Sequence, residues 1–207
     1  MRIFRKCHKK ITRGQDHSLS IIAAEKVGVI FRLFFHRFQG FGNVDHHSFG
    51  TFQYNMEGAL KNGLDVGVYF FSQAVTAAEA IEEAEYLLEA IAEYDVTMPV
   101  VFDMEIVTES EEARANSLSP SERAVITEAF CERIAEAGYS PMIYGNPAWL
   151  LSKMDWQSLP DYPLWLAQYS REPFFPYEFT MWQYTSTGRV NGIDGDVDLN
   201  LCFSSGW

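Results

Sequence analysis

Residues 99–106 read PVVFDMEI, an apolar run that ends with two acids one residue apart, Asp103 and Glu105. A short apolar run of this kind is typical of a buried strand. It follows residues 80–94, AIEEAEYLLEAIAEY, whose apolar side chains recur at helical spacing. A helix that leads into a buried strand is the repeating unit of an α/β protein.

The helix before this strand carries its own start signal. Thr76 and Glu79 have the T-x-x-E spacing of a capping box, in which each side chain binds the other residue's backbone N–H. The apolar face of the helix is predicted to contain Ile81, Ala84, Leu88 and Ile91.

Two further helices are indicated by their ends. Ser119 and Glu122 form a second capping box with Pro120 at the first helical position, and this helix is predicted to stop at Gly138. Another helix is predicted over residues 49–63.

Short strand-like runs lie between these helices and continue after them. The runs are residues 27–35, 65–71, 99–105, 141–145, 164–170, 179–186 and 195–200. Their alternation with helices in the first two thirds of the chain predicts a parallel sheet with crossover helices. In the last third the turns are rich in Pro, Gly and Ser, and only residues 146–155 suggest a short helix. The chain is therefore predicted to form one domain, 1–207, an α/β barrel whose last part is mostly strand.

The two acids of the central run suggest a chemistry. Residues two apart on a strand share a face, so Asp103 and Glu105 are expected to project together, with Val101 behind them. In α/β barrels, inward side chains at the carboxyl ends of strands build the active site. Two neighbouring acids suit glycoside hydrolysis, because one stays protonated to donate to the leaving oxygen while the other stays ionised. The alternative is a solvent-exposed strand end, since D-x-E alone is a weak signal.

Aromatic and amide side chains lie near the ends of the other predicted strands. They are Tyr69, Tyr144, Trp165, Trp182, Gln183 and Tyr184. Sugars stack on aromatic rings while amides and carboxylates bind their hydroxyls, so this set suits a saccharide cleft; the alternative for each ring is the barrel core. Asp194, Asp196 and Asp198 have a loose calcium-like spacing, but the loop of an EF-hand is absent from the sequence.

Composition excludes several classes of partner. The chain has 16 basic and 28 acidic residues and a formal charge of −12, which argues against nucleic acid and anionic membranes. The 3 cysteines predict no disulfide framework, and no ligand spacing predicts a metal site. No apolar run reaches the roughly 18 residues of a membrane span. MRIFRKCHKK, residues 1–10, is not followed by the apolar region of a secretory signal.

Several motifs of the chain occur together: residues 65–84, 99–105, 141–146, 164–169 and 181–200. In sequence and in order they resemble the family 25 glycoside hydrolases, which are lysozymes of the N-acetylmuramidase type from bacteria and their phages. The resemblance implies an irregular TIM-like barrel of about five β/α units followed by three strands. It also implies hydrolysis, without a cofactor, of the β-1,4 bond between N-acetylmuramic acid and N-acetylglucosamine in peptidoglycan.

The resemblance also implies roles for individual residues. Glu105 falls on the family's proton donor, Asp103 on its charge-stabilising partner, and Asp198 on the aspartate of a final V-D-x-N. Four further positions fall on residues that line the family's cleft: Tyr69, Tyr144, Trp165 and Gln183. The expected partner is the glycan strand of peptidoglycan, bound by a monomer that acts outside the cell or at the wall.

The first fifty residues depart from the family pattern. Family members open with a strand like G-I-D-V-S and continue to W-Q-G, and this chain has neither. Asp16 is the nearest acid but lies too close to Arg32 to match, so the first strand is predicted to be atypical or missing. Two alternatives therefore stay open: a non-catalytic barrel that binds cell-wall glycan, and a different glycosidase such as a chitin-active one. A retaining or inverting outcome is also left open.

Overall fold

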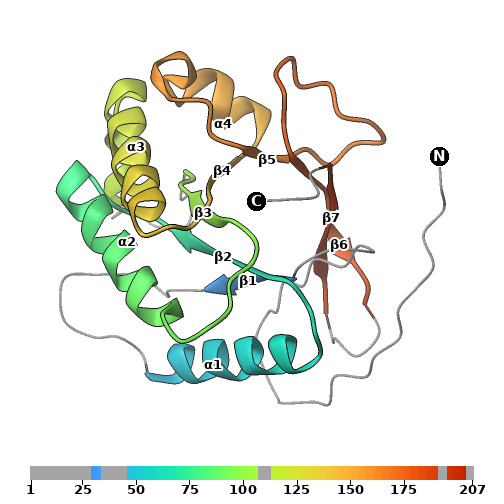
Figure 1. The fold of residues 1–207 in the computed structure, drawn as a ribbon. Coiled ribbons are helices and arrows are strands. Elements are labelled where there is room, and N and C mark those ends of the chain that lie inside the picture. The colour runs from blue at the N-terminus through green and yellow to red at the C-terminus, as the bar shows by residue number, and fades with distance from the viewer. Residues whose placement is uncertain (1–28, 34–45, 107–112, 191–194, 204–207) are drawn as a thin grey trace.

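A seven-stranded sheet with its strands in chain order forms the centre of the structure, a computed structural model that describes residues 29–33, 46–106, 113–190 and 195–203 (Figure 1). The strands are β1 (Val29–Leu33), β2 (Val66–Phe71), β3 (Val100–Asp103), β4 (Pro141–Gly145), β5 (Leu164–Ala167), β6 (Met181–Gly188) and β7 (Val197–Cys202). Strands β1 to β6 pair in parallel, and β7 pairs with β6 in antiparallel orientation. The carboxyl ends of the parallel strands therefore meet at one edge of the sheet.

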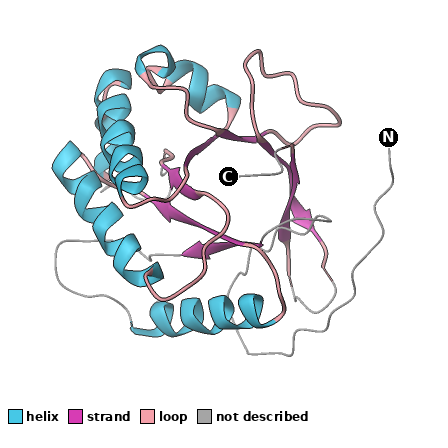
Figure 2. Ribbon diagram, viewed as in Figure 1, coloured by secondary structure: helices cyan, strands magenta, loops and turns pink. Residues whose placement is uncertain are grey.

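Helices cover the outer side of the curled sheet along its first strands (Figure 2). They are α1 (His46–Lys61), α2 (Ala77–Ile91), α3 (Pro120–Glu136) and α4 (Pro147–Ser152), with short 3-10 helices η1 (Arg114–Ser117) and η2 (Trp156–Ser158). Among the helices that the structure describes, none is both long and apolar enough to cross a membrane.

This architecture confirms the α/β class, with the sheet curled into a half-barrel. Within the described residues, four β/α units, from β1–α1 to β4–α4, precede the three strands β5, β6 and β7. The sequence predicted about five units. Another unit, together with the atypical first strand and Asp16, would fall outside the described residues, so the full number of units stays a prediction.

The two predicted capping boxes differ in the structure. At α3 the box is complete, because Ser119 Oγ accepts from the Glu122 N–H and the Glu122 carboxylate accepts from the Ser119 N–H. At α2, Thr76 Oγ1 accepts from the Glu79 N–H, but Glu79 Oε2 accepts from the Val75 N–H instead of that of Thr76. The predicted hydrogen bond from the Thr76 N–H to Glu79 is therefore wrong, because the donor is the residue before Thr76.

The buried face of α2 also differs from the prediction. Its buried residues are Ala80, Ala84, Leu87 and Ile91. Ile81 is 41% exposed, and Leu88 packs only partly against the core. The predicted and observed faces share Ala84 and Ile91, and both have helical spacing. Other apolar residues lie on both sides of the face that contains Ala84 and Ile91. Periodicity alone therefore does not decide which side of the helix turns toward the core.

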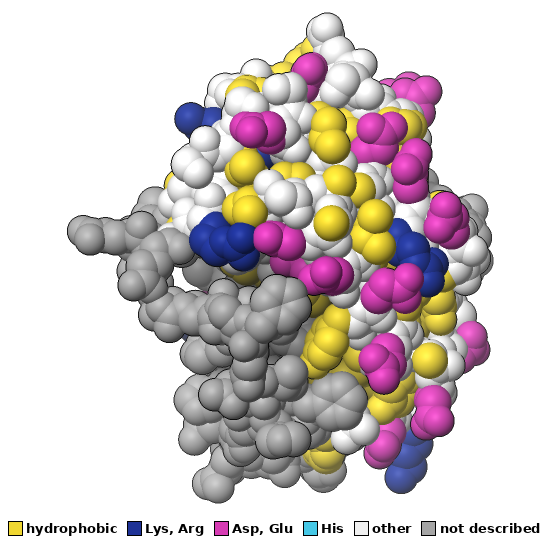
Figure 3. Space-filling view, turned by 90° about the vertical axis from the view of Figure 1, so that its left-hand side faces the viewer, with side chains coloured by type: hydrophobic (Ala, Val, Ile, Leu, Met, Phe, Trp, Pro, Cys, Tyr) yellow, Lys and Arg dark blue, Asp and Glu magenta, His cyan; other side chains and the backbone are white. Residues whose placement is uncertain are grey.

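Acidic side chains are scattered over the face of the molecule that α2 and α3 form, with apolar and uncharged groups between them (Figure 3). The exposed acids of these helices and the turn after α2 are Glu82, Glu85, Glu89, Glu93, Glu122, Glu132 and Glu136. Arg133 of α3 binds Glu85 of α2 across this face at 2.5 Å. The acidic charge on this face is therefore a solvated surface.

Alternating side chains of the sheet divide the core into two clusters. The outer cluster, between the sheet and the helices, contains Val100, Phe102 and Met104. The inner cluster, inside the curl of the sheet, consists of Tyr69, Met98, Val101, Met142, Trp165 and Met181. This alternation sends every second side chain of β3 inward, toward the candidate site.

Candidate active site

The end of β3 carries the first two acids. Asp103 is the last residue of the strand and is only 5% exposed. It lies two residues after Val101 of the inner cluster, so it continues the inward face. Glu105 follows beyond the strand and is partly exposed. The alternative of a solvent-exposed strand end is therefore wrong for Asp103.

Tyr144 of β4 is the residue around which the three predicted acids gather. It pairs with Asp103 in the register of β3 and β4. The pKa of its phenol is raised well above the ordinary value, first by burial and then by the negative charges of Asp103, Glu105 and Asp198. The effect of a charge weakens with distance, so the acids of β3 and β7 lie in the neighbourhood of the same phenol.

Gln183 of β6 connects this phenol to a second one. Its Oε1 accepts the Tyr144 hydroxyl at 3.0 Å and the Tyr169 hydroxyl at 2.7 Å, and the residue is 3% exposed. The two phenolic donors fix the amide with its oxygen toward them. The pKa of Tyr169 is also raised, first by burial and then by the charge of Asp198, with a smaller effect of Glu105. Both phenols therefore stay protonated at neutral pH and keep donating.

Aromatic rings form the base of the site. The ring of Trp165 meets Tyr144 edge-on at a centroid distance of 4.9 Å and Tyr69 edge-on at 6.2 Å. Its Nε1 donates to Asn200 Oδ1 of β7 at 2.7 Å. Trp165 is 4% and Tyr69 is 7% exposed, so both rings are buried in the inner cluster, and Tyr144 lies beside Trp165 in the register of β4 and β5.

Contacts and strand register thus connect five of the seven residues predicted from the sequence: Asp103, Tyr69, Tyr144, Trp165 and Gln183. The other two, Glu105 and Asp198, act on Tyr144 through their charge. Sequence reasoning missed two neighbours of these residues, Tyr169 and Asn200. Tyr169 is four residues after Trp165, and Asn200 is two after Asp198, so period-two alternation within the predicted strands 164–170 and 195–200 could have found both. The structure places Asp196 elsewhere, in an exposed ion pair with Arg189, and Asp194 lies outside the described residues.

This arrangement suits acid–base chemistry on a neutral substrate. Neighbouring carboxylates disfavour each other's ionisation, which helps one of them to hold a proton while another stays charged. The partly exposed Glu105 is in the position to meet a substrate, whereas Asp103 is buried beside Tyr144. Within the described residues, no three His, Cys, Asp or Glu side chains form a group that could hold a metal ion.

Comparison with known proteins gives a family model that matches more than half of the chain. The sequence model of Glycosyl hydrolases family 25 matches residues 44–193. The D-alanyl-L-alanine endopeptidase of Streptococcus phage B30 is 29% identical over 148 residues, 65% of this chain and 31% of that protein. The autolytic lysozyme of Clostridium acetobutylicum is 25% identical over 157 residues, 75% of this chain and 44% of that protein.

A solved structure agrees with these matches. The modular autolysin LytC from Streptococcus pneumoniae is 27% identical and superposes with a TM-score of 0.65, over 83% of this chain and 39% of that chain. This chain thus spans less than half the length of each of these three proteins.

Proposed function

Because this chain belongs to glycosyl hydrolases family 25, we propose that it hydrolyses the β-1,4 bond between N-acetylmuramic acid and N-acetylglucosamine in peptidoglycan, at the bacterial cell wall. The observation that carries the proposal is that buried Asp103 lies beside Tyr144 in the sheet, while Glu105 and Asp198 act on the pKa of the same phenol. The names of an autolytic lysozyme and of an autolysin among the related proteins support the same substrate.

Glu105 is the general acid in this proposal. It lies past the end of β3 and is partly exposed, so its carboxyl group can reach the oxygen of the scissile bond. Protonation of that oxygen lets the bond to the muramic acid carbon break, and water completes the hydrolysis. One product then carries a new reducing end on N-acetylmuramic acid, and the other carries a hydroxyl group on N-acetylglucosamine, formed from the protonated leaving oxygen.

Asp103 and Asp198 are the ionised partners. Positive charge develops on the sugar ring as the bond breaks, and a fixed carboxylate beside the ring stabilises it. Asp103 is held inside the sheet at the end of β3, and Asp198 approaches from β7. Asp103 can alternatively orient the substrate's acetamido group.

The Tyr144–Gln183–Tyr169 hydrogen-bond unit binds the substrate in this account. The hydrogens of both phenols are directed to Gln183 Oε1, so the two phenolic oxygens present acceptors to the hydroxyl and amide donors of the sugar. Trp165 packs edge-on against Tyr144 of this unit, and Tyr69 packs edge-on against Trp165.

A two-product assay tests the proposed bond. Peptidoglycan treated with the protein is analysed for new reducing ends and for new amino groups. The proposal predicts reducing ends on muramic acid, whereas new amino groups alone would indicate an endopeptidase and contradict it. Glu105→Gln is expected to lower the rate by about 10²–10⁴-fold. The matched control is Glu57→Gln, at an exposed glutamate of α1, which is expected to keep the wild-type rate.

Binding assays separate the remaining alternatives. Protein that sediments with insoluble peptidoglycan but releases no reducing ends would be a non-catalytic glycan-binding barrel. Faster release from chitin oligomers than from peptidoglycan would instead identify a chitin-active glycosidase.

A further inference from the structure

The turn between β2 and α2, residues 72–76, is bonded directly to the strand end that carries the acids. The backbone N–H of Ser72 donates to the backbone oxygen of Asp103 at 2.7 Å. In the register of the sheet, Phe71 lies beside Asp103, so Ser72 is the first residue past the ladder. The position of this turn therefore constrains the backbone from which Asp103 and Glu105 project.

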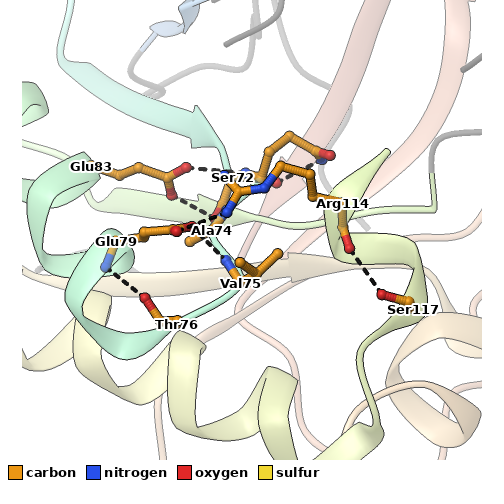
Figure 4. A network of polar contacts seen from close by, with 9 residues as sticks. Ser72, Ala74, Val75, Thr76, Glu79, Glu83, Arg114 and Ser117 are labelled. Carbon is orange, nitrogen blue, oxygen red and sulfur yellow. Dashed lines mark hydrogen bonds and ion pairs between the residues drawn. The ribbon is translucent and has the colours of Figure 1, made fainter. Parts of the chain in front are cut away.

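Glu83 of α2 accepts hydrogen bonds from several residues of this turn (Figure 4). The Ser72 hydroxyl donates to Glu83 Oε2 at 2.6 Å, and the Gln73 N–H donates to Glu83 Oε1 at 3.1 Å. The Ala74 N–H donates to the Ser72 hydroxyl oxygen at 3.2 Å. One carboxylate thus holds two consecutive residues directly and a third through the same serine.

Glu79, one helical turn earlier, holds the next part of the turn more loosely. It accepts from the Val75 N–H at 2.9 Å and from Arg114 of η1 at 2.8 Å. The Arg114 side chain is 56% exposed, and an exposed ion pair contributes little because water screens it. The firm anchor of the turn is therefore Glu83.

Burial of Glu83 is costly and needs a reason. Burial raises the pKa of Glu83 to about 7, although the hydrogen bonds from Ser72 and Gln73 oppose the rise. A helix that only had to pack against the sheet would place an apolar side chain here at lower cost. Buried acids with shifted pKa values concentrate near functional sites, where geometry has to be held.

We infer that Glu83 is a positioning residue: it fixes Ser72, and through the Ser72–Asp103 backbone hydrogen bond it holds Asp103 and Glu105 in the geometry that glycan cleavage needs. This inference rests on the proposed function for its kinetic part. Glu83 does not touch the substrate, so its loss acts on the chemical step and leaves substrate binding in place.

The test compares Glu83→Ala and Glu83→Gln with two controls, using soluble glycan strands of peptidoglycan as substrate. Small displacements of reacting groups cost up to about 10²-fold in rate, so Glu83→Ala is expected to lose kcat on that order with KM little changed. Glu83→Gln keeps an acceptor for the Gln73 N–H and a group that can bond Ser72, so it is expected to recover most of kcat.

The controls separate positioning from general stability. Glu82→Gln changes an exposed glutamate next in sequence, and Ser119→Ala removes the cap of α3 and so destabilises the fold without removing a hydrogen bond of residues 72–76. Both are expected to keep the wild-type kcat. A kcat of Glu83→Ala equal to that of Ser119→Ala would overturn the inference.

A readout without turnover keeps the two proposals distinguishable. Amide hydrogen exchange at Ser72 is expected to accelerate in Glu83→Ala beyond its rate in Ser119→Ala. If the wild-type protein cleaves no glycan, the proposed function fails, while faster exchange at Ser72 still supports the positioning contact. Unchanged exchange at Ser72 overturns it.

Discussion

Two pairs of acids lie on either side of the β2–α2 turn, and their surroundings differ. Glu79 and Glu83 on α2 face N–H and hydroxyl donors of the turn, so their oxygens are occupied by the protein itself. Asp103 and Glu105 at the end of β3 face a phenol and another acid, Asp198. A carboxylate surrounded by backbone donors holds structure, whereas one that shares a site with other acids is suited to proton transfer.

Asp103→Asn is expected to give the largest difference between the acids at the end of β3 and the acids of α2. Loss of the fixed negative charge removes stabilisation of the positive charge on the sugar ring, and we expect kcat to fall by about 10²–10³-fold. Stability is expected to change little, because the amide has the same shape. Reducing-end release and urea unfolding of the same samples measure both. An undiminished kcat would place Asp103 with the structural acids.

Glu83→Gln tests the acids of α2 through the pH dependence of the free energy of unfolding. The folded protein holds a proton on Glu83 up to a pKa of about 7, whereas the unfolded chain releases it near 4.5. Unfolding therefore releases a proton between these values, and the free energy of unfolding falls as pH rises from about 4.5 to 7. At about 1.4 kcal/mol per pH unit, this contribution amounts to about 3 kcal/mol and is constant outside that window.

Urea unfolding at pH 4.5 and pH 8 measures this effect. The wild-type protein is expected to lose about 3 kcal/mol more between the two pH values than Glu83→Gln does. The control Glu82→Gln, at an exposed position, is expected to follow the wild-type protein. Equal pH dependence in wild type and Glu83→Gln would show that Glu83 titrates normally.

Tyr144→Phe sharpens the comparison on the catalytic side. It removes the hydroxyl that donates to Gln183 and leaves the ring contact with Trp165 in place. Loss of one hydrogen bond at the site is expected to cost about 1.4 kcal/mol in transition-state stabilisation, about tenfold in kcat/KM. Steady-state kinetics on soluble glycan strands measure it. Tyr177→Phe, at an exposed tyrosine of the loop 168–180, is the matched control.

Ser119→Ala and Thr76→Ala are expected to give the smallest effects, and these effects are on the free energy of unfolding. Ser119 belongs to a complete capping box, and its loss is expected to cost about 1 kcal/mol of unfolding free energy. Thr76 makes only one half of a box, so we expect about half that cost. Urea unfolding checks both, and a larger cost for Thr76→Ala would contradict the difference between the boxes.

Strand periodicity made much of the site predictable. Val101 and Asp103 face inward because side chains alternate, and Tyr144 and Trp165 join them because parallel strands end at one edge. Local signals likewise located α3, from its cap at Ser119 to Gly138, which has a φ of 88°. Such features depend on neighbours in sequence or on a fixed period.

Contacts between distant segments were not predictable in this way. Glu83 is one of several glutamates in α2, and nothing local separates it from the exposed Glu82. Its role depends on which face of α2 lies against the sheet. Periodicity predicted a face that includes Ile81, whereas Ile81 is exposed. Tyr169 lies within the predicted strand 164–170, but its hydrogen bond to Gln183 joins it to another strand, and that contact cannot be read from the local sequence.

A crystal structure of Glu105→Gln with a bound glycan fragment of peptidoglycan would show whether Glu105 is the general acid. We expect the oxygen of the scissile bond about 2.6–3.2 Å from the side chain at position 105, with Asp103 and Asp198 beside the muramic acid ring. A fragment bound along α2 and α3, or inside the sheet with its scissile oxygen beyond reach of that side chain, would contradict this expectation.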